Sequence, residues 1–349
     1  FVKALGEPRA RKATPAEWAL EMISADVGGV EREDRVVKAW ATQGAEKVKQ
    51  LQCSSSNSSN NARGGSPLDA FRHTAVLFER AMMNTLRNPM VIWVRLTMDI
   101  VLSLVIATVW WDIGSDVTAS DVNNLASVLF FIAAFQAFMA ITSMHSFLED
   151  KAVFVKEKSS GCYNVISYNV SAFLASSPFL LFIAIVCSLI IYFSLSLNSE
   201  GGKFFIYTLN LFLTLLCADA VAFLVAAIMP IYIAALAACA FIFGTFMIVQ
   251  GFFIHFPDIP AGWRWLHWVG FHSYSFRTAL YNQFEGTVIL KDVNTYPPAM
   301  SNVSGEVFLY NFDFQEEDLT RNCLIMVGMA IVYRLIAAFW QHFFHTGTQ

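Results

Sequence analysis

Apolar side chains dominate this sequence of 349 residues: 56% are hydrophobic, only 14% are charged, and the mean hydropathy is +0.50. Such a composition excludes a soluble domain of this length and indicates a protein that folds in a lipid bilayer. The formal net charge of −4 provides neither a basic field for nucleic acid nor an acidic tail.

Three segments precede the first membrane span. Residues 1–52 are polar, with an amphipathic helix expected around Trp18, and residues 53–66 are a run of Ser, Asn and Gly expected to be a disordered linker. Residues 67–90 combine apolar side chains with arginines, the pattern of an amphipathic connecting helix on the membrane surface. The sequence does not begin with Met, and we expect it to be part of a longer chain.

Six stretches are long and apolar enough to cross a bilayer, which takes about 20 residues of helix. Helices are expected because every backbone polar group must be satisfied within the segment and strand-like alternation is absent. The sequence therefore predicts an all-α membrane protein with a six-span transmembrane domain over residues 91–349. The predicted spans are residues 91–111, 125–147, 170–197, 204–229, 231–253 and 322–344.

Basic side chains predict how the spans are oriented. They gather before the first span and in the turn between the second and third spans, so we assign both places to the cytosol. The loop between the first two spans holds aspartates and no basic residue, which suits the opposite side. Six spans then leave both termini cytosolic. The basic residues are Arg72, Arg80, Arg87, Lys151, Lys156 and Lys158.

Residues 255–321 are too long for a simple connector and too mixed for a seventh span. Aromatic residues are frequent from Trp263 to Phe284, which favours an interfacial or re-entrant helix, and the rest predicts an extracellular cap. Asn302 begins an Asn-Val-Ser sequence in this region, so we expect it to be glycosylated.

The sequence contains no phosphate-binding loop, no nucleophile elbow and no paired metal-ligand motif. We predict no catalytic residue, no metal site and no cofactor for this chain. The six cysteines are scattered, and Cys323 near the outer end of the last span is either a free thiol or a bridge to a second copy. The ionisable residues within the spans are isolated along the sequence, and we expect structural pairing among them. They are Arg95, Asp99, Asp219 and Arg334.

Short motifs follow one another along the chain in a definite order. They are Thr14-Pro15-Ala16-Glu17-Trp18, Arg87-Asn88-Pro89, Val153-Phe154 followed by Glu157, Gly161-Cys162-Tyr163, His272-Ser273-Tyr274 and Asn282-Gln283-Phe284. Each is weak alone, but in this order and spacing they resemble the G subfamily of ABC transporters, the half-size white or drug-resistance type. The resemblance covers nearly the whole chain.

The resemblance implies an ATP-binding domain upstream on the same polypeptide, and ATP and Mg are expected there. It also implies a second half-transporter, identical or different, with the transport pathway lined by spans two and five. Bulky apolar residues that share a face on these spans are candidates for the substrate cavity, and the alternative is contact with lipid or neighbouring helices. The candidates are Phe131, Phe135, Phe138, Phe243 and Met247.

Two further groups of residues are candidates for function. Phe252 and Phe253 end the fifth span where the family has an apolar pair that closes the cavity, so they form either a gate or ordinary packing. The charged turn after the second span predicts a docking surface for the ATP-binding domain, with a solvated loop as the alternative. Its residues are Glu149, Asp150, Val153, Phe154, Glu157 and Lys158. His145 is either structural or part of a polar relay with this turn.

The sequence thus predicts the permease domain of an ATP-driven exporter of lipid-like or amphipathic small molecules, in contact with membrane lipids and at the plasma membrane. A passive channel or a polytopic scaffold without a nucleotide partner is the alternative. A membrane-embedded enzyme would need clustered polar ligands that the sequence does not display.

Overall fold

The computed structural model describes residues 67–87, 93–115, 117, 121–198, 201–289, 303–311 and 318–344. The predicted segment 1–52, the linker 53–66 and Asn302 lie outside these residues. Residues Ala70–Gln349 form one compact unit, to which all the contacts below belong. Nearly all of the described chain is helical, which confirms the all-α class.

The elements are α6 (Pro67–Arg87), α7 (Arg95–Val109), α8 (Asp121–Phe138), η3 (Met139–Ser143), α9 (Met144–Ser159), α10 (Val165–Ser194), α11 (Lys203–Ile228), α12 (Tyr232–Ile248), η4 (Phe256–Asp258), α13 (Arg264–Val269), α14 (Phe271–Phe284), β1 (Val288–Ile289), β2 (Val303–Ser304), α15 (Gly305–Asn311) and α16 (Leu319–Phe344).

Four helical segments in the described part of the chain are long and apolar enough to cross a membrane: Asp121–Ser159, α10, α11 and α16. They coincide with four of the six predicted spans. Within the other two predicted spans, the structure has helices of 15 residues (α7) and 17 residues (α12). A span of about 30 Å needs about 20 residues, so a six-span count remains a prediction.

The segment Asp121–Ser159 is one helical rod of 39 residues with a 3-10 segment, η3, in its middle. The charge pattern predicts a turn from Glu149 to Gly161, and this is wrong for most of the segment, because α9 remains helical through Ser159. Charged residues do not break a helix when one of its faces is buried, and Phe154 on α9 is completely buried. The turn itself begins at Ser160, before Gly161 with its positive φ.

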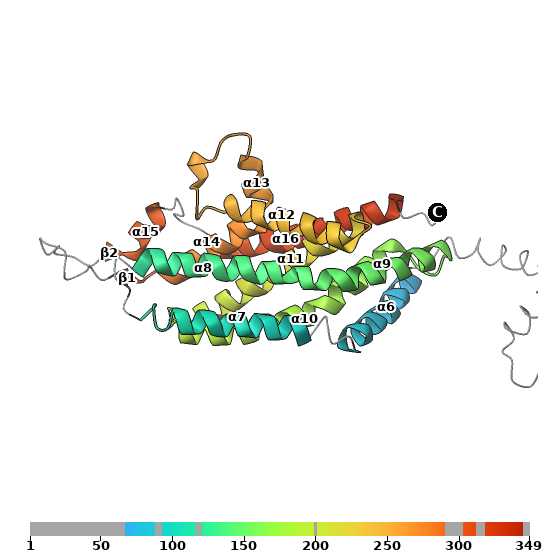
Figure 1. The fold of residues 1–349 in the computed structure, drawn as a ribbon, viewed down its shortest axis with the longest axis horizontal. Helices are drawn as coiled ribbons and strands as arrows, with labels where there is room; N and C mark the ends of the chain where they lie inside the picture. The colour runs from blue at the N-terminus through green and yellow to red at the C-terminus, as the bar shows by residue number, and fades with distance from the viewer. Residues whose placement is uncertain are drawn as a thin grey trace, which may run out of the picture. The chain divides into compact units, whose positions relative to one another are not determined.

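Helix α11 is the centre of the bundle, and most of its side chains are buried. Helices α10, α14 and α16 pack along it, and α7 runs beside α10 (Figure 1). By contrast, α10 and α16 each expose a stripe of large apolar side chains, as a helix in contact with lipid does. Examples are Leu174, Leu181, Phe182, Ile331 and Leu335.

The aromatic segment after α12 divides into an exposed part and a buried part. Trp263, Trp265 and Trp268 on and before α13 are each more than half exposed, whereas nearly every residue of α14 is buried. The 14 residues of α14 are too few to cross a bilayer, and α14 packs on α11 and α16. This arrangement suits the re-entrant helix, which remains a prediction. The short antiparallel pair β1–β2 and α15 follow at the same end of the bundle (Figure 1).

The ends of α7 and α10 meet through backbone hydrogen bonds. The N–H of Asp112 donates to the carbonyl of Ser194 at 2.9 Å, and the N–H of Gly114 donates to Leu195, also at 2.9 Å. Asp112 and Ser196 both have positive φ, and their side chains are hydrogen-bonded to each other. Gly114 is required for this close approach, because a Cβ atom there would lie 2.5 Å from the carbonyl oxygen of Ser196.

We expect Gly114→Ala to push the two loops apart and to destabilise the domain by about 1–3 kcal/mol, the cost of overpacking. Thermal unfolding of the purified protein measures this. The control is Gly328→Ala on α16, where an added Cβ meets nothing within 4 Å. An equal effect of both substitutions would show that the loop contact contributes nothing specific.

Candidate functional site

A cluster of four ionisable side chains lies inside the bundle. Arg334 on α16 donates a hydrogen bond to Asp219 on α11 at 2.8 Å. Arg95 on α7 lies 3.8 Å from the carboxylates of both Asp219 and Asp99 and donates a hydrogen bond to the hydroxyl of Ser143 at 2.7 Å. The expected pairing is thus confirmed, and residues isolated in the sequence share one network, named here the ion cluster.

The ion cluster is almost free of solvent: Asp99 is 0%, Asp219 1%, Arg95 3% and Arg334 6% exposed. Burial of four charges is costly unless each has partners, and the two arginines and two aspartates balance in formal charge. Aromatic rings supply further partners. The Arg334 guanidinium lies 4.0 Å from the ring centre of Phe223 and 5.5 Å from that of Phe173, distances at which a cation is attracted to a ring face.

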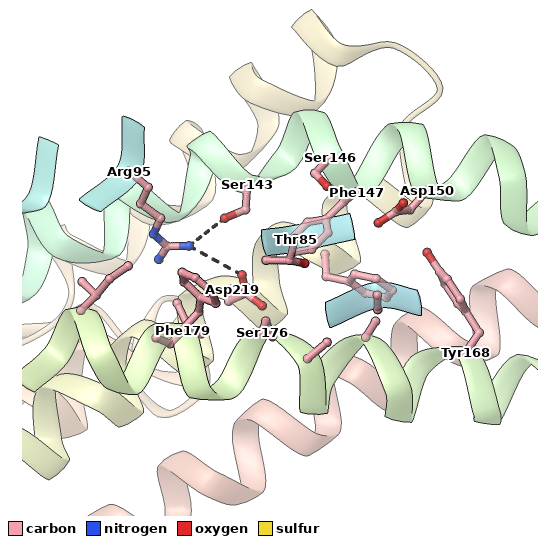
Figure 2. A pocket seen from close by; sticks show the side chains of 16 residues that line it. Thr85, Arg95, Ser143, Ser146, Phe147, Asp150, Tyr168, Ser176, Phe179 and Asp219 are labelled. Atoms are coloured by element: carbon pink, nitrogen blue, oxygen red, sulfur yellow. Dashed lines mark hydrogen bonds and ion pairs between the residues drawn. The ribbon is translucent and has the colours of Figure 1, made fainter. Parts of the chain in front are cut away.

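A cavity of about 60 Å³ borders the ion cluster. Figure 2 shows Arg95, Ser143 and Asp219 at one end of its lining and Asp150 and Tyr168 at the other. Hydroxyl groups line the space between these ends. They belong to Thr85 of α6, Ser146 of α9 and Ser176 of α10.

Two lysines of α9 bind the carboxyl ends of other helices. The Lys151 Nζ donates to the carbonyl oxygens of Ala226 at 3.0 Å and Met229 at 2.9 Å, at the end of α11. The Lys158 Nζ donates to those of Gln341 at 2.8 Å and His342 at 2.9 Å, in the last turns of α16. The last carbonyls of a helix have no partner within it, so each lysine satisfies groups that α11 and α16 leave free.

Helix α9 is also hydrogen-bonded to α6. Arg80 donates to both carboxylate oxygens of Glu157, at 2.7 and 2.9 Å, and the Tyr163 hydroxyl donates to the same carboxylate at 2.6 Å. The hydrogen bond from Arg80 to Glu157 raises the pKa of Arg80. Burial of Tyr163, and next its own hydrogen bond to Glu157, raise the pKa of Tyr163. Asn84 donates to Asp150 at 3.3 Å, so two side chains of α6 are hydrogen-bonded to α9.

The predicted docking residues therefore lie on two different faces of α9. Phe154 is buried and stacks on Tyr168 at 4.4 Å, while Glu157, Asp150 and Lys158 contact other helices of this chain. The opposite face is exposed: Val153 is 46% exposed, and Glu149 is exposed and paired with His145 at 3.2 Å. Their docking role stays a prediction, and the free surface of α9 is the face with Glu149, Val153 and Lys156.

Four of the five predicted cavity residues form two aromatic pairs. Phe138 and Phe243 meet edge to face at 5.7 Å, and Phe131 and Phe135 lie 5.5 Å apart. Phe131 is 37% exposed, whereas Phe243 is wholly buried against Phe138 and Phe271. Their contact with a substrate stays a prediction. Met247 is half-buried against the core.

The predicted gate residues belong to an aromatic cluster. Phe252 stacks on Phe130 at 4.8 Å, and Phe253 contacts the same ring at 5.0 Å. Phe253 is 60% exposed, so it is available to a second copy or to lipid. The gate also stays a prediction.

Sequence reasoning did not identify Ser143 and Tyr168 as cavity residues or the lysines of α9 as helix caps. A usable signal existed for α9, because Lys151, Phe154 and Lys158 follow the spacing of one helical face.

Cys323 is half-buried and unbridged in the single chain. Across the described ranges, no group of three or more His, Cys, Asp or Glu side chains is placed to hold a metal ion.

We expect Asp219→Asn to destabilise the protein by about 3–5 kcal/mol, because it leaves two buried arginines with one fewer carboxylate. The double variant Asp219→Asn with Arg334→Met removes a charge of each sign and should recover part of this loss. Thermal and denaturant unfolding of the purified variants test both statements. The control is Glu149→Gln, which breaks an exposed pair and should change the stability by under about 1 kcal/mol. A double variant less stable than Asp219→Asn would contradict pairing as the role of Arg334.

Known proteins resemble this chain over much of its length. Residues 72–284 match the family model of the ABC-2 type transporter. The chain is 30% identical over 265 residues to ABC transporter G family member 1 of Petunia hybrida, a match that covers 75% of this chain and 40% of the relative. It is 28% identical over 279 residues to ABC transporter G family member 11 of Arabidopsis thaliana, covering 78% and 38%.

A third relative is ABC transporter G family member STR of Medicago truncatula, 27% identical over 281 residues, with 75% of this chain and 34% of the relative covered. The matches thus span well under half the length of these relatives. The family match takes in α7 to α14 and therefore the ion cluster up to Asp219, the cavity beside it and α9. The chain belongs to the ABC-2 type transporter family, as a membrane domain of the kind found in ABC transporters of the G family.

Proposed function

We propose that this chain is the permease domain of an ATP-driven exporter that moves lipid-like or amphipathic small molecules by alternating access as a dimer. Membership in the ABC-2 type transporter family carries this proposal. An ATP-binding domain of the same polypeptide, with ATP and Mg, supplies the driving force. A second half-transporter, identical or different, completes the pathway.

The exposed face of α9 supports a coupling role. A partner that contacts Val153 and its neighbours moves a helix whose other face holds the ends of α11 and α16 through Lys151 and Lys158. Displacement of α9 therefore acts directly on two helices of spanning length. An ordinary solvated loop would lack these contacts.

The aromatic residues of α8 and α12 support the substrate class. Phe131, Phe135, Phe138, Phe243 and Met247 offer flat or flexible apolar surfaces without a charge, which suit an apolar ligand of loosely specified shape. Phe252 and Phe253 would close this space toward the outside. The proposed cavity lies between two protomers and is completed by the second.

The proposed topology has six spans, both termini in the cytosol and residues 255–321 outside, with α13–α14 re-entrant and Asn302 glycosylated at the plasma membrane. The basic residues of α6 and α9 support it, since cations gather on the cytosolic side.

For topology, we expect a glycan at Asn302 that is lost in Asn302→Gln. We expect a thiol reagent to label Lys156→Cys only when it is added from the cytosolic side. Both positions on one side of the membrane would overturn this topology.

For transport, we expect Phe138→Ala and Phe131→Ala in the full-length protein each to raise KM for an exported amphiphile by about ten- to a hundredfold. Loss of a buried aromatic contact costs about 1.5–3 kcal/mol, and 1.4 kcal/mol is a factor of ten. Proteoliposome transport of a fluorescent phospholipid, a fluorescent sterol and an amphipathic dye measures this. Phe205→Ala, at a position that is 75% exposed on α11, is the control. Unchanged transport in both test variants removes the cavity assignment.

For coupling, we expect Val153→Asp to reduce substrate transport and substrate-stimulated ATP hydrolysis several-fold without lowering the thermal unfolding temperature. The exposed side chain contributes to docking and not to the core. Ala152→Asp introduces the same charge one residue away, on another exposed face of α9, and serves as the control. Equal losses in both variants would show a general charge effect on the helix and contradict a specific contact at Val153. A passive channel would transport equally with and without ATP.

A further inference from the structure

A second cavity lies beside the one that borders the ion cluster. Its volume is about 390 Å³, and α6, α9 and α10 form its walls. Arg80, Asn84 and Arg87 of α6 line it, together with the exposed Val153 of α9. The two cavities share part of their lining. The shared residues are Ala81, Asp150, Tyr168 and Ala172.

The cavity beside the ion cluster is named here the inner cavity, and the second one the outer cavity. The inner cavity is lined by a residue whose hydrogen-bond donors lack partners. Arg95 is 3% exposed, and its Nε and second terminal nitrogen have no hydrogen-bond partner among the described residues. A buried polar group without a partner costs about 1–3 kcal/mol, and more when it is charged. The cavity has room for about two water molecules at ~30 Å³ each.

Most of the side chains that line the inner cavity are apolar, among them Phe147, Phe179 and Leu180, but polar groups follow one another along its length and can hold these waters. Ser143 lies at the Arg95 end, Asp150 at the far end, and the hydroxyls of Thr85, Ser146 and Ser176 lie between them (Figure 2). A buried water needs about three hydrogen-bond partners, and hydroxyl groups both donate and accept. Apolar rings alone would leave the space dry.

We propose that the two cavities form a hydrated passage within a single protomer, which brings water from the α6 face to Arg95 and Asp219. The passage is separate from the proposed substrate cavity, because neither Phe138 nor Phe243 lines it. Its ligand is water, together with small ions that water carries. Water at Arg95 can replace a carboxylate partner when helices shift, so the ion cluster rearranges without exposing a bare charge to hydrocarbon.

Silver ions test the passage, since they fit a water-filled space and react with thiolates. In a full-length protein whose native cysteines are all replaced, including the six of this chain, Ser176→Cys places one thiol in the inner cavity. Ser188→Cys is the matched control: it is on the same helix, 0% exposed and on the lining of neither cavity. Silver is added separately to each side of sealed vesicles, and the thiol that remains is counted with maleimide after unfolding.

We expect Ser176→Cys to react at least tenfold faster than Ser188→Cys, and from the α6 side only. Ala172→Leu narrows the shared wall and should slow the reaction of Ser176→Cys toward the control rate, while Met83→Cys, at a 44% exposed position that lines only the outer cavity, stays fast. Ala81→Leu makes the same test from α6 where Ala172→Leu does not fold. Equal rates at Ser176→Cys and Ser188→Cys, entry from the other side, or no effect of either leucine would overturn the proposal. The assay measures access and not transport, so its outcome is independent of the exporter proposal.

Discussion

The ion pair between Arg334 and Asp219 is the interaction on which the packing of the bundle depends. Asp219 lies on the central helix α11, and it receives Arg334 from α16 at 2.8 Å and Arg95 from α7 at 3.8 Å. Three helices far apart in the sequence are thereby held at one depth. In an apolar surrounding these ion pairs favour one arrangement of the helices, because any other arrangement leaves a charge without a partner. Apolar packing between lipid-like surfaces discriminates much less between alternative helix arrangements.

Helix α9 supplies the second constraint, at the end of the bundle where α11 and α16 stop. Lys151, Phe154 and Lys158 share one face, so the same surface that buries an aromatic ring also satisfies the free carbonyls of two helix ends. The connecting helix α6 joins this assembly through Arg80 and Glu157. One helix thus fixes three others, and the exposed face with Val153 is the part of it left for an external partner.

Hydropathy predicted the long helices well because a bilayer imposes a physical length on them. The span expected at residues 204–229 is the helix Lys203–Ile228, and the one expected at 322–344 is Leu319–Phe344. The pairing of Arg95 with Asp219 carries no local signal, since it depends on how three helices pack. Alternating charges predict a turn from Glu149, whereas the structure is helical to Ser159 because Val153 and Phe154 lie on different faces of the helix, one exposed and one buried. The cavity roles depend on the family resemblance and the docking role on the charge pattern of α9, and both stay predictions because they concern contacts with a second protomer and with an ATP-binding domain.

The 3-10 segment η3 connects these constraints. It interrupts the rod Asp121–Ser159 between the aromatic part, α8, and the charged part, α9, and mid-helix 3-10 segments are frequent hinge positions. Phe138, immediately before η3, contacts Phe243 on α12, while Ser143, at its end, accepts the hydrogen bond from Arg95. Bending of the rod at η3 would therefore affect the Arg95–Ser143 contact and the Phe138–Phe243 contact together, because Ser143 and Phe138 lie at the two ends of this segment. The ion cluster and the aromatic pair are then two responses to one movement, and water beside Arg95 reduces the energetic cost of the first.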